Sequence, residues 1–285
     1  MTGAGGAPRG AGRRSAAPAL HRPAPGGSGG WRSPWPWWPV LVAALAAGLF
    51  LRIYQLRTQM LLDDEWHAVR MLVRADAAAI AAHFGLADYC IPLTLYYRWL
   101  YDHAALSEWS MHLPLLLAGI GLLVAAPWLL RRTLPLPVLA IWTGLLAISP
   151  SLVYFSRTAR PYALVALLGV VAIVAFRNAQ VQRRRRRAWA AVYVVATFVA
   201  GWAHLLSLVF TLWPFVHYGT RALRDAMRNP PGAHGWRPLL GLLGLGVVTV
   251  AALAAALGPP LLNDWGAMAA KAGADSVDAR SLYRT

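Results

Sequence analysis

Three consecutive carboxylates, Asp63, Asp64 and Glu65, lie directly after an apolar run that is long enough to cross a bilayer. Charges next to hydrocarbon are costly, so their position at the end of a membrane span indicates a function. A carboxylate at the membrane surface can act as a general base toward an acceptor hydroxyl. Asp63 and Glu65 are also candidate ligands for Mg²⁺ or Mn²⁺, because hard cations prefer oxygen. The alternative is a solvated helix start stabilised by the helix dipole.

Two arginines, Arg157 and Arg160, lie in the stretch SRTARPYAL between two later apolar runs. A guanidinium can clamp a phosphate with two parallel hydrogen bonds, so both are candidate phosphate-binding residues. Their alternative role is to extend to the membrane interface at a helix start. Other polar side chains near these charges are candidate substrate contacts: His67, Tyr96, Tyr162 and His204.

The composition is that of a membrane protein, since 58% of the 285 residues are hydrophobic and only 13% are charged. The formal charge of +16 could suggest nucleic acid as a partner. The basic residues fall between apolar runs rather than on one face, however, so they are better explained as topology signals. We therefore expect no nucleic-acid partner. One cysteine, Cys90, excludes an intramolecular disulfide, and we expect it to be a packing residue.

The apolar runs predict an all-α polytopic membrane protein with about seven transmembrane helices. Lys and Arg favour cytoplasmic loops, so the arginines of the first 36 residues place the N-terminus in the cytoplasm. The same rule assigns later arginines to that side: Arg131, Arg132, Arg183 to Arg187, Arg221, Arg224 and Arg228. The expected spans are 37–56, 112–130, 135–154, 161–177, 188–203, 205–219 and 237–257.

These assignments agree with one another only if the polar, tyrosine-rich run 90–106 does not cross the membrane. We expect it to form an amphipathic helix in the outer interface, with a second such helix over about 64–84. The expected organisation is a disordered basic cytoplasmic arm (1–36), a transmembrane domain (37–257) whose outer loop covers 57–111, and an outer-side tail (258–285).

This topology gathers the carboxylates, Arg160 and His204 at the outer face although they are distant in sequence. A base and a phosphate-binding cation suit a displacement in which a polyprenyl-phosphate leaves, because that leaving group needs no acid to protonate it. The lipid tail would lie among the spans, with membrane lipid around it.

The order of the polar motifs resembles that of a known family. The motifs are Asp64-Glu65, Ile91-Pro92-Leu93 to Tyr96-Tyr97, His112-Leu113-Pro114-Leu115, Ser149-Pro150 to Leu164, and Ala203-His204. Over roughly residues 37–220 they resemble GT-C superfamily membrane glycosyltransferases, nearest to the protein O-mannosyltransferase and aminoarabinose-transferase-like family.

The resemblance implies an inverting glycosyltransferase with a GT-C-like fold. A sugar would move from a polyprenyl-phosphate donor to the hydroxyl of an acceptor, which would be a protein, a lipid or a glycan. Asp64 would be the base and Arg160 would lie near the donor phosphate. The chain departs from the family at Cys90-Ile91-Pro92, where His-Pro-Pro is usual, at His112 in place of arginine, and at Ala203 in place of threonine.

Family members usually continue with further spans and often an outer soluble domain, so the sequence is expected to be a fragment, a short relative or half of a split enzyme. The arginine- and alanine-rich composition favours the plasma membrane of a bacterium with GC-rich DNA. The alternative functions are a transporter or flippase of a lipid-linked sugar, and a non-catalytic subunit of a membrane glycosylation complex.

Overall fold

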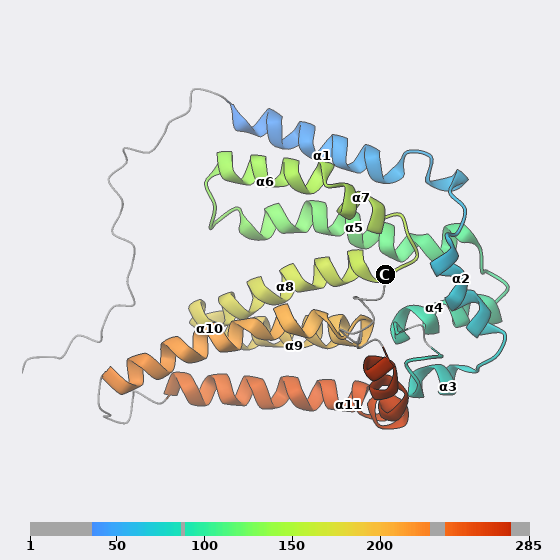
Figure 1. Ribbon diagram of the computed structural model, residues 1–285. Coiled ribbons are helices and arrows are strands. Elements are labelled where there is room, and N and C mark those ends of the chain that lie inside the picture. The colour runs from blue at the N-terminus through green and yellow to red at the C-terminus, as the bar shows by residue number, and fades with distance from the viewer. Residues whose placement is uncertain (1–35, 87–88, 229–236, 275–285) are drawn as a thin grey trace, which may run out of the picture. The chain divides into compact units, whose positions relative to one another are not determined.

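The computed structural model of the protein describes residues 36–86, 89–228 and 237–274 (Figure 1). Throughout these ranges the regular secondary structure is helical. The chain divides into two units, 1–36 and 37–285, and the account below concerns the second. The basic arm expected over 1–36 lies outside the described residues except for Pro36, as do residues 275–285 of the expected tail.

Four helical segments of the described chain are long and apolar enough to cross a membrane: Trp37–Thr58, Glu108–Leu130, Tyr162–Val181 and Pro238–Ala267. They contain α1 (Trp37–Ile53), α5 (Glu108–Leu130), α8 (Tyr162–Val181) and most of α11 (Arg237–Ala274). A helix needs about 20 residues to cross the hydrocarbon layer, so these segments indicate a membrane protein.

The remaining expected spans are also helical but are not among those four segments. They are α6 (Leu136–Ile148), which is apolar but shorter, followed by α7 (Pro150–Phe155), α9 (Arg186–Ala203) and α10 (Ser207–Arg228). A bundle of about seven spans therefore stays a prediction.

The long helices pack side by side with alternating chain direction. In Figure 1, α1, α6 and α5 lie together, α5 packs on α8, α8 on α9, and α9 on α10 and α11. The α5–α6 and α8–α9 connections and the end of α10 lie together at one end of this bundle, at the left of Figure 1. We call this the basic end, because the arginines that the sequence assigned to one side lie there: Arg131, Arg132, Arg183 to Arg187, Arg221, Arg224 and Arg228.

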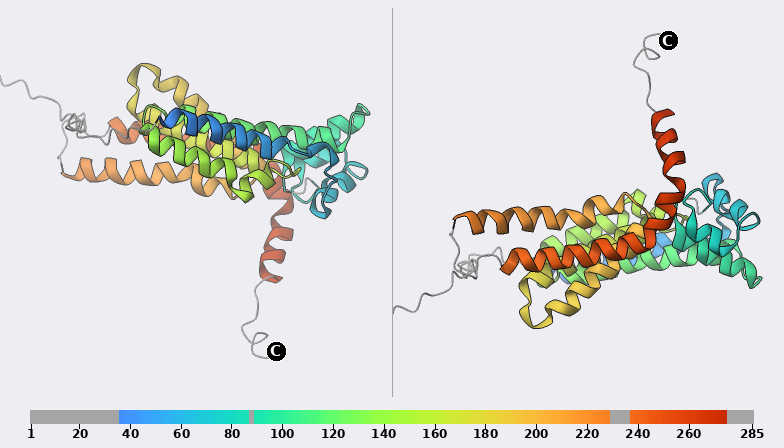
Figure 2. Two further views of the ribbon diagram at one scale, coloured as in Figure 1. Left: turned by 90° about the horizontal axis from the view of Figure 1, so that it is seen from above. Right: turned by 90° about the horizontal axis from the view of Figure 1, so that it is seen from below.

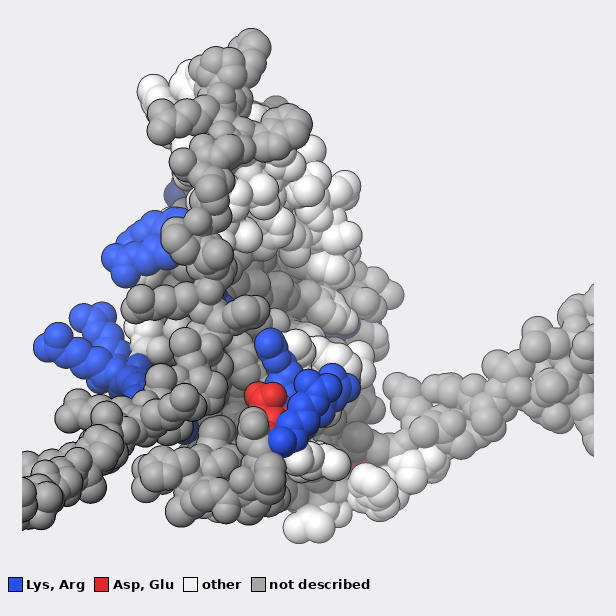
Figure 3. Space-filling model, turned by 90° about the vertical axis from the view of Figure 1, so that its left-hand side faces the viewer, with Lys and Arg blue, Asp and Glu red and all other residues white. Residues whose placement is uncertain are grey.

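Figure 3 looks onto the basic end, where arginine side chains project around a small acidic patch. The α6–α8 and α9–α10 connections lie at the opposite end, together with the short helices that follow α1. We call this the site end.

Large apolar side chains point outward along the bundle. Leu117 is 59% exposed, Val209 72% and Val247 68%. Contiguous exposed apolar surface is costly in water but suits contact with lipid tails. The outward residues therefore support the membrane assignment independently of helix length.

The region after α1 contains three short helices, α2 (Asp63–Leu72), α3 (Ala77–Ala82) and α4 (Ile91–Asp102). With 12 residues, α4 rises only about 18 Å, too little to cross a bilayer, which agrees with the predicted non-spanning segment. The single helix predicted over 64–84 is wrong, since it is two helices. Asp76 causes the break, because its Oδ1 accepts from the Ala79 N–H at 2.7 Å and starts a new helix.

The described part of the tail predicted over 258–285 is helical. Helix α11 continues to Ala274 and bends sharply (Figure 2); Pro259 and Pro260 lie inside it. Beyond the prolines, Asp264 contacts His83 Nδ1 at 2.7 Å and Asn263 donates to the Ala82 carbonyl at 3.0 Å. Asn263 and Asp264 thus hold the bend against the end of α3, and the last part of α11 projects away from the bundle (Figure 2).

Helices α1 and α6 cross closely at Gly48. A Cβ at that position would lie 2.7 Å from Leu123 Cδ2 and 2.9 Å from Ala147 Cβ. One turn later, the fully buried Arg52 donates to the carbonyls of Leu146 at 3.1 Å and Ala147 at 3.2 Å. These carbonyls lie in the last turn of α6, where helix carbonyls lack intrahelical partners. The buried cation is therefore a helix cap.

We expect Gly48→Ala to lower the thermal unfolding midpoint of the detergent-solubilised protein, because the added methyl group would clash with the Cβ and Cα atoms of Ala147. Overpacking of this kind costs about 1–3 kcal/mol. Gly144→Ala on α6 is the matched control, since nothing lies within 4 Å of its added Cβ. Equal midpoints for the two variants would contradict the close crossing.

Candidate functional site

Glu65 occupies the third position of α2, and its carboxylate closes the start of that helix. Its Oε2 accepts from the Leu62 N–H at 2.5 Å. A glutamate at this position commonly satisfies a free N–H at the helix start. Unlike an ordinary capping glutamate, Glu65 is only 1% exposed. Its carboxylate therefore needs partners beyond its own helix.

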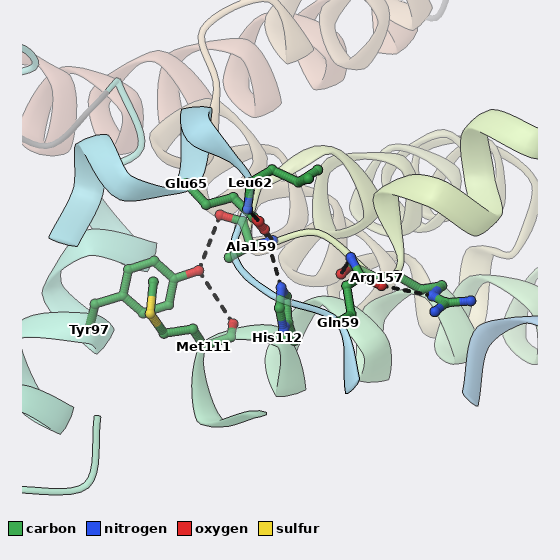
Figure 4. Close-up of polar contacts among 8 residues, drawn as sticks. All are labelled: Gln59, Leu62, Glu65, Tyr97, Met111, His112, Arg157 and Ala159. Carbon is green, nitrogen blue, oxygen red and sulfur yellow. Dashed lines mark hydrogen bonds and ion pairs between the residues drawn. The ribbon is translucent and has the colours of Figure 1, made fainter. Parts of the chain in front are cut away.

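Those partners come from two other parts of the chain (Figure 4). Glu65 Oε1 accepts from the backbone N–H of Ala159, in the connection between α7 and α8. The same oxygen lies 3.2 Å from Nε2 of the buried His112 on α5. A carboxylate only accepts hydrogen bonds, so Nε2 carries the proton. Glu65 thus joins α2, α5 and the α7–α8 connection at the site end.

The donors around Glu65 also determine its charge. Burial by itself would raise the pKa of Glu65, but the hydrogen bonds from His112, Leu62 and Ala159 outweigh burial and hold the pKa below its usual value. The carboxylate is therefore ionised at neutral pH. Buried and surrounded by donors, it is suited to holding structure rather than to binding a substrate.

The backbone carbonyl of Ala159 is held as well, by Tyr97 of α4. Its hydroxyl lies 3.2 Å from the Ala159 carbonyl and 3.3 Å from the Met111 carbonyl, both acceptors for its proton. Tyr97 is fully buried, and burial is the main cause that raises its pKa well above the usual value. The charge of Glu65 adds to that rise in the pKa and the charge of Arg160 opposes it. Ala159 is thus held at both its N–H and its carbonyl, one residue before the half-buried Arg160.

Arg157 is tied to the segment after α1. Its Nε donates to Gln59 Oε1 at 3.1 Å, and Gln59 Nε2 donates back to the Arg157 carbonyl at 2.9 Å. Its Nη1 also donates to the Leu51 carbonyl at 3.3 Å. These contacts make Arg157 a structural link between α1 and the α7–α8 connection, a role that neither of its two expected roles included.

Tyr162 at the start of α8 and His204 in the α9–α10 connection come together at the site end. Their ring centroids are 5.5 Å apart, and the ring centroid of Phe155 lies 4.5 Å from that of Tyr162. Tyr162 is 40% exposed, so its ring is accessible. Burial lowers the pKa of His204, which favours the neutral imidazole. Tyr162 is two residues beyond Arg160 in sequence, and together with His204 it forms an aromatic and imidazole surface.

The remaining predicted site residues are less closely grouped. Tyr96 donates from its hydroxyl to the Ser110 carbonyl at 3.0 Å, and His67 lies on the exposed side of α2. The backbone of Asp63 and Asp64 forms the first turn of α2, and their side chains lie outside the described part. Among the described side chains no cluster of three metal-binding residues occurs, so the Mg²⁺ or Mn²⁺ site at Asp63 and Glu65 stays a prediction.

The sequence analysis gave Gln59, Tyr97 and His112 no role in the site, although Tyr97 and His112 lie in the motifs that it singled out. His112 carried a signal, because an ionisable residue inside an apolar run usually has a partner. Gln59 and Tyr97 carried no comparable signal, since both are ordinary residues of a polar segment.

No protein-family model, no curated protein and no solved structure matches this chain.

We expect Glu65→Gln to destabilise the protein, because the amide nitrogen of glutamine must face one of the N–H donors that the carboxylate now accepts from. Leaving a buried donor unsatisfied costs about 1–3 kcal/mol. The measurement is the thermal unfolding midpoint in detergent, with Glu108→Gln, the same change at an exposed helix start, as the control.

The pH dependence supplies a second test of the same contact. A folded pKa below the unfolded one stabilises the fold fully above the usual glutamate pKa, and this contribution is lost as the pH falls through the lower folded value. The midpoints of the wild type and Glu65→Gln should therefore converge in acid. A constant difference at all pH values would contradict the ionised, bonded carboxylate.

Proposed function

We propose that the protein is a glycosyltransferase that moves a sugar from a polyprenyl-phosphate donor to an acceptor hydroxyl at the outer face of a bacterial plasma membrane. The observation that carries the proposal is the bond from Glu65 to the Ala159 N–H. It draws the start of α2, with Asp63 and Asp64, toward the segment that bears Arg160. This contact supports the proposal, because the segments that bear the proposed base, Asp64, and the proposed phosphate-binding residue, Arg160, meet at the site end.

The proposed step is an inverting displacement. Asp64 takes the proton of the acceptor hydroxyl as the oxygen attacks the anomeric carbon. The bond between that carbon and the phosphate oxygen breaks, and the polyprenyl-phosphate leaves with the electron pair. Arg160 stabilises the negative charge on the leaving phosphate. Glu65 is a positioning residue in this scheme, because its oxygens are already occupied by Leu62, His112 and Ala159.

Tyr162 and His204 supply the contacts to the donor sugar. A half-exposed aromatic ring suits the apolar face of a sugar, and a neutral imidazole can donate to or accept from a sugar hydroxyl. The polyprenyl chain has an apolar surface to follow, since the helices below the site expose large aliphatic side chains to lipid.

We expect Asp64→Asn to reduce sugar transfer by about 10²–10⁴-fold, because the amide cannot accept the hydroxyl proton. Arg160→Gln should reduce transfer by about 10²–10³-fold through loss of charge at the leaving group. The assay follows labelled sugar from undecaprenyl-phosphate hexoses and pentoses in membranes that contain the protein. Asp102→Asn is the matched control, because Asp102 lies in an exposed ion pair with Arg98. Full activity of Asp64→Asn would remove it as the base.

The orientation can be tested by cysteine labelling in intact cells. In a Cys90→Ala background, a cysteine at the exposed position of Trp66 should react with an impermeant maleimide added outside. A cysteine at the exposed position of Arg185 should react only after the membrane is opened. The reverse pattern would place the proposed site in the cytoplasm and end the proposal for an outer-face reaction.

A further inference from the structure

A cavity of about 640 Å³ lies at the basic end, between α8, α9 and α11. Its walls are mostly apolar, with Val194 and Val195 on α9 and Val248 on α11. Arg186 and Arg187 also line it, at the start of α9. Its volume is within the range of about 300–1,000 Å³ that is typical of ligand sites. This cavity is remote from the Glu65 region, and the proposed sugar transfer does not use it.

Glycines in α11 keep the cavity open. Gly241 and Gly244 both line it, and their spacing of three places them on one face of the helix. A Cβ at Gly241 would lie 2.2 Å from Nη2 of Arg186, so the guanidinium packs directly against the helix backbone. Nothing lies within 4 Å of a Cβ at Gly244, so that position borders open space.

The guanidinium groups of the two arginines that line this cavity can bind an anionic ligand. Both are exposed, and they follow Arg183–Arg185 directly in the chain. The ion pairs found among the described residues, at His83, Arg98 and His112, do not include them. Paired guanidinium groups bind phosphate oxygens through charge-assisted hydrogen bonds.

We propose that this cavity binds an anionic phospholipid of the surrounding leaflet, with its phosphate between Arg186 and Arg187 and its acyl chains along the valine-lined wall. The charge and the apolar wall together select this occupant. A free phosphate would use the arginines but not the wall, and a zwitterionic lipid would use the wall but gain less from two cations. The cavity is bordered by α8 and α11, which are both candidate membrane spans, so lipid reaches it from the side. Basic pockets between membrane helices commonly hold anionic headgroups.

The test measures binding of phosphatidylglycerol to the full chain in detergent by native mass spectrometry, with phosphatidylcholine of the same acyl chains as the comparison. We expect the Arg186→Gln, Arg187→Gln double variant to bind phosphatidylglycerol roughly 10- to 30-fold more weakly. The matched control is Arg183→Gln, Arg184→Gln, which removes the same charge from residues that do not line the cavity. It should change the affinity less than threefold, which corresponds to a change in the binding free energy of less than about 0.7 kcal/mol.

A second variant tests the cavity without changing charge. Gly244→Leu should fill the open space and weaken phosphatidylglycerol binding, whereas Gly219→Leu on α10, also with nothing within 4 Å of its Cβ, should not. If Gly244→Leu does not fold, the arginine pairs still decide the question. Circular dichroism and gel filtration report folding for every variant.

Several results would overturn the proposal. Equal losses for both arginine pairs would show diffuse surface attraction instead of a site. Displacement of the lipid by millimolar inorganic phosphate would show a phosphate site without a lipid component. Equal affinity for phosphatidylcholine would remove the role of charge. A dimer that Gly244→Leu converts to monomer, with no lipid bound, would show that a second copy covers the cavity.

Discussion

The backbone of Ala159 is the point on which the site end depends. Glu65 accepts from its N–H and Tyr97 donates to its carbonyl, so helices α2 and α4 hold the connection that carries Arg160. The residues Glu65 and Ala159 are separated by 94 positions in sequence. A buried carboxylate is costly unless its oxygens are satisfied, so the same group that joins these elements also requires them to be present. His112 supplies the remaining donor from α5. The position of Arg160 is therefore tied to the charge of Glu65.

Because successive helices run in opposite directions, the polar residues of the connections fall into two groups, one at each end of the bundle. Arginines from several connections collect at the basic end, while Glu65, Arg160 and His204 lie with the short helices at the site end. The apolar side chains between the ends face outward. The proposed sugar transfer at one end and the proposed lipid site at the other are compatible with this division, because in each an arginine would bind a phosphate. Arg160 follows Ala159, whose backbone is hydrogen-bonded to Glu65 and Tyr97. Arg186 packs against the backbone of α11 at Gly241.

Much of the helix pattern could be predicted from the residues. The break at His204 lies between α9 and α10, as the polar interruption indicated, and the tyrosine-rich segment forms a helix too short to cross. The single helix expected over 64–84 was wrong because a local signal for a helix start was overlooked. Asp76 starts a new helix, which the apolar pattern of 64–84 conceals. Beyond Pro259 and Pro260, the expected tail is helical in its described part, and Asp264 and Asn263 contact the end of α3.

The sequence by itself determined where the apolar helices run and which arginines share an end, because hydropathy and charge act locally along a chain. It also identified Asp63, Asp64 and Glu65 as a group worth attention. Only the tertiary structure decided that Glu65 is buried and that Arg157 is a link to Gln59. The sequence alone does not show that Glu65 is surrounded by hydrogen-bond donors. Those donors come from α5 and from the α7–α8 connection, and their approach is a property of the packed chain.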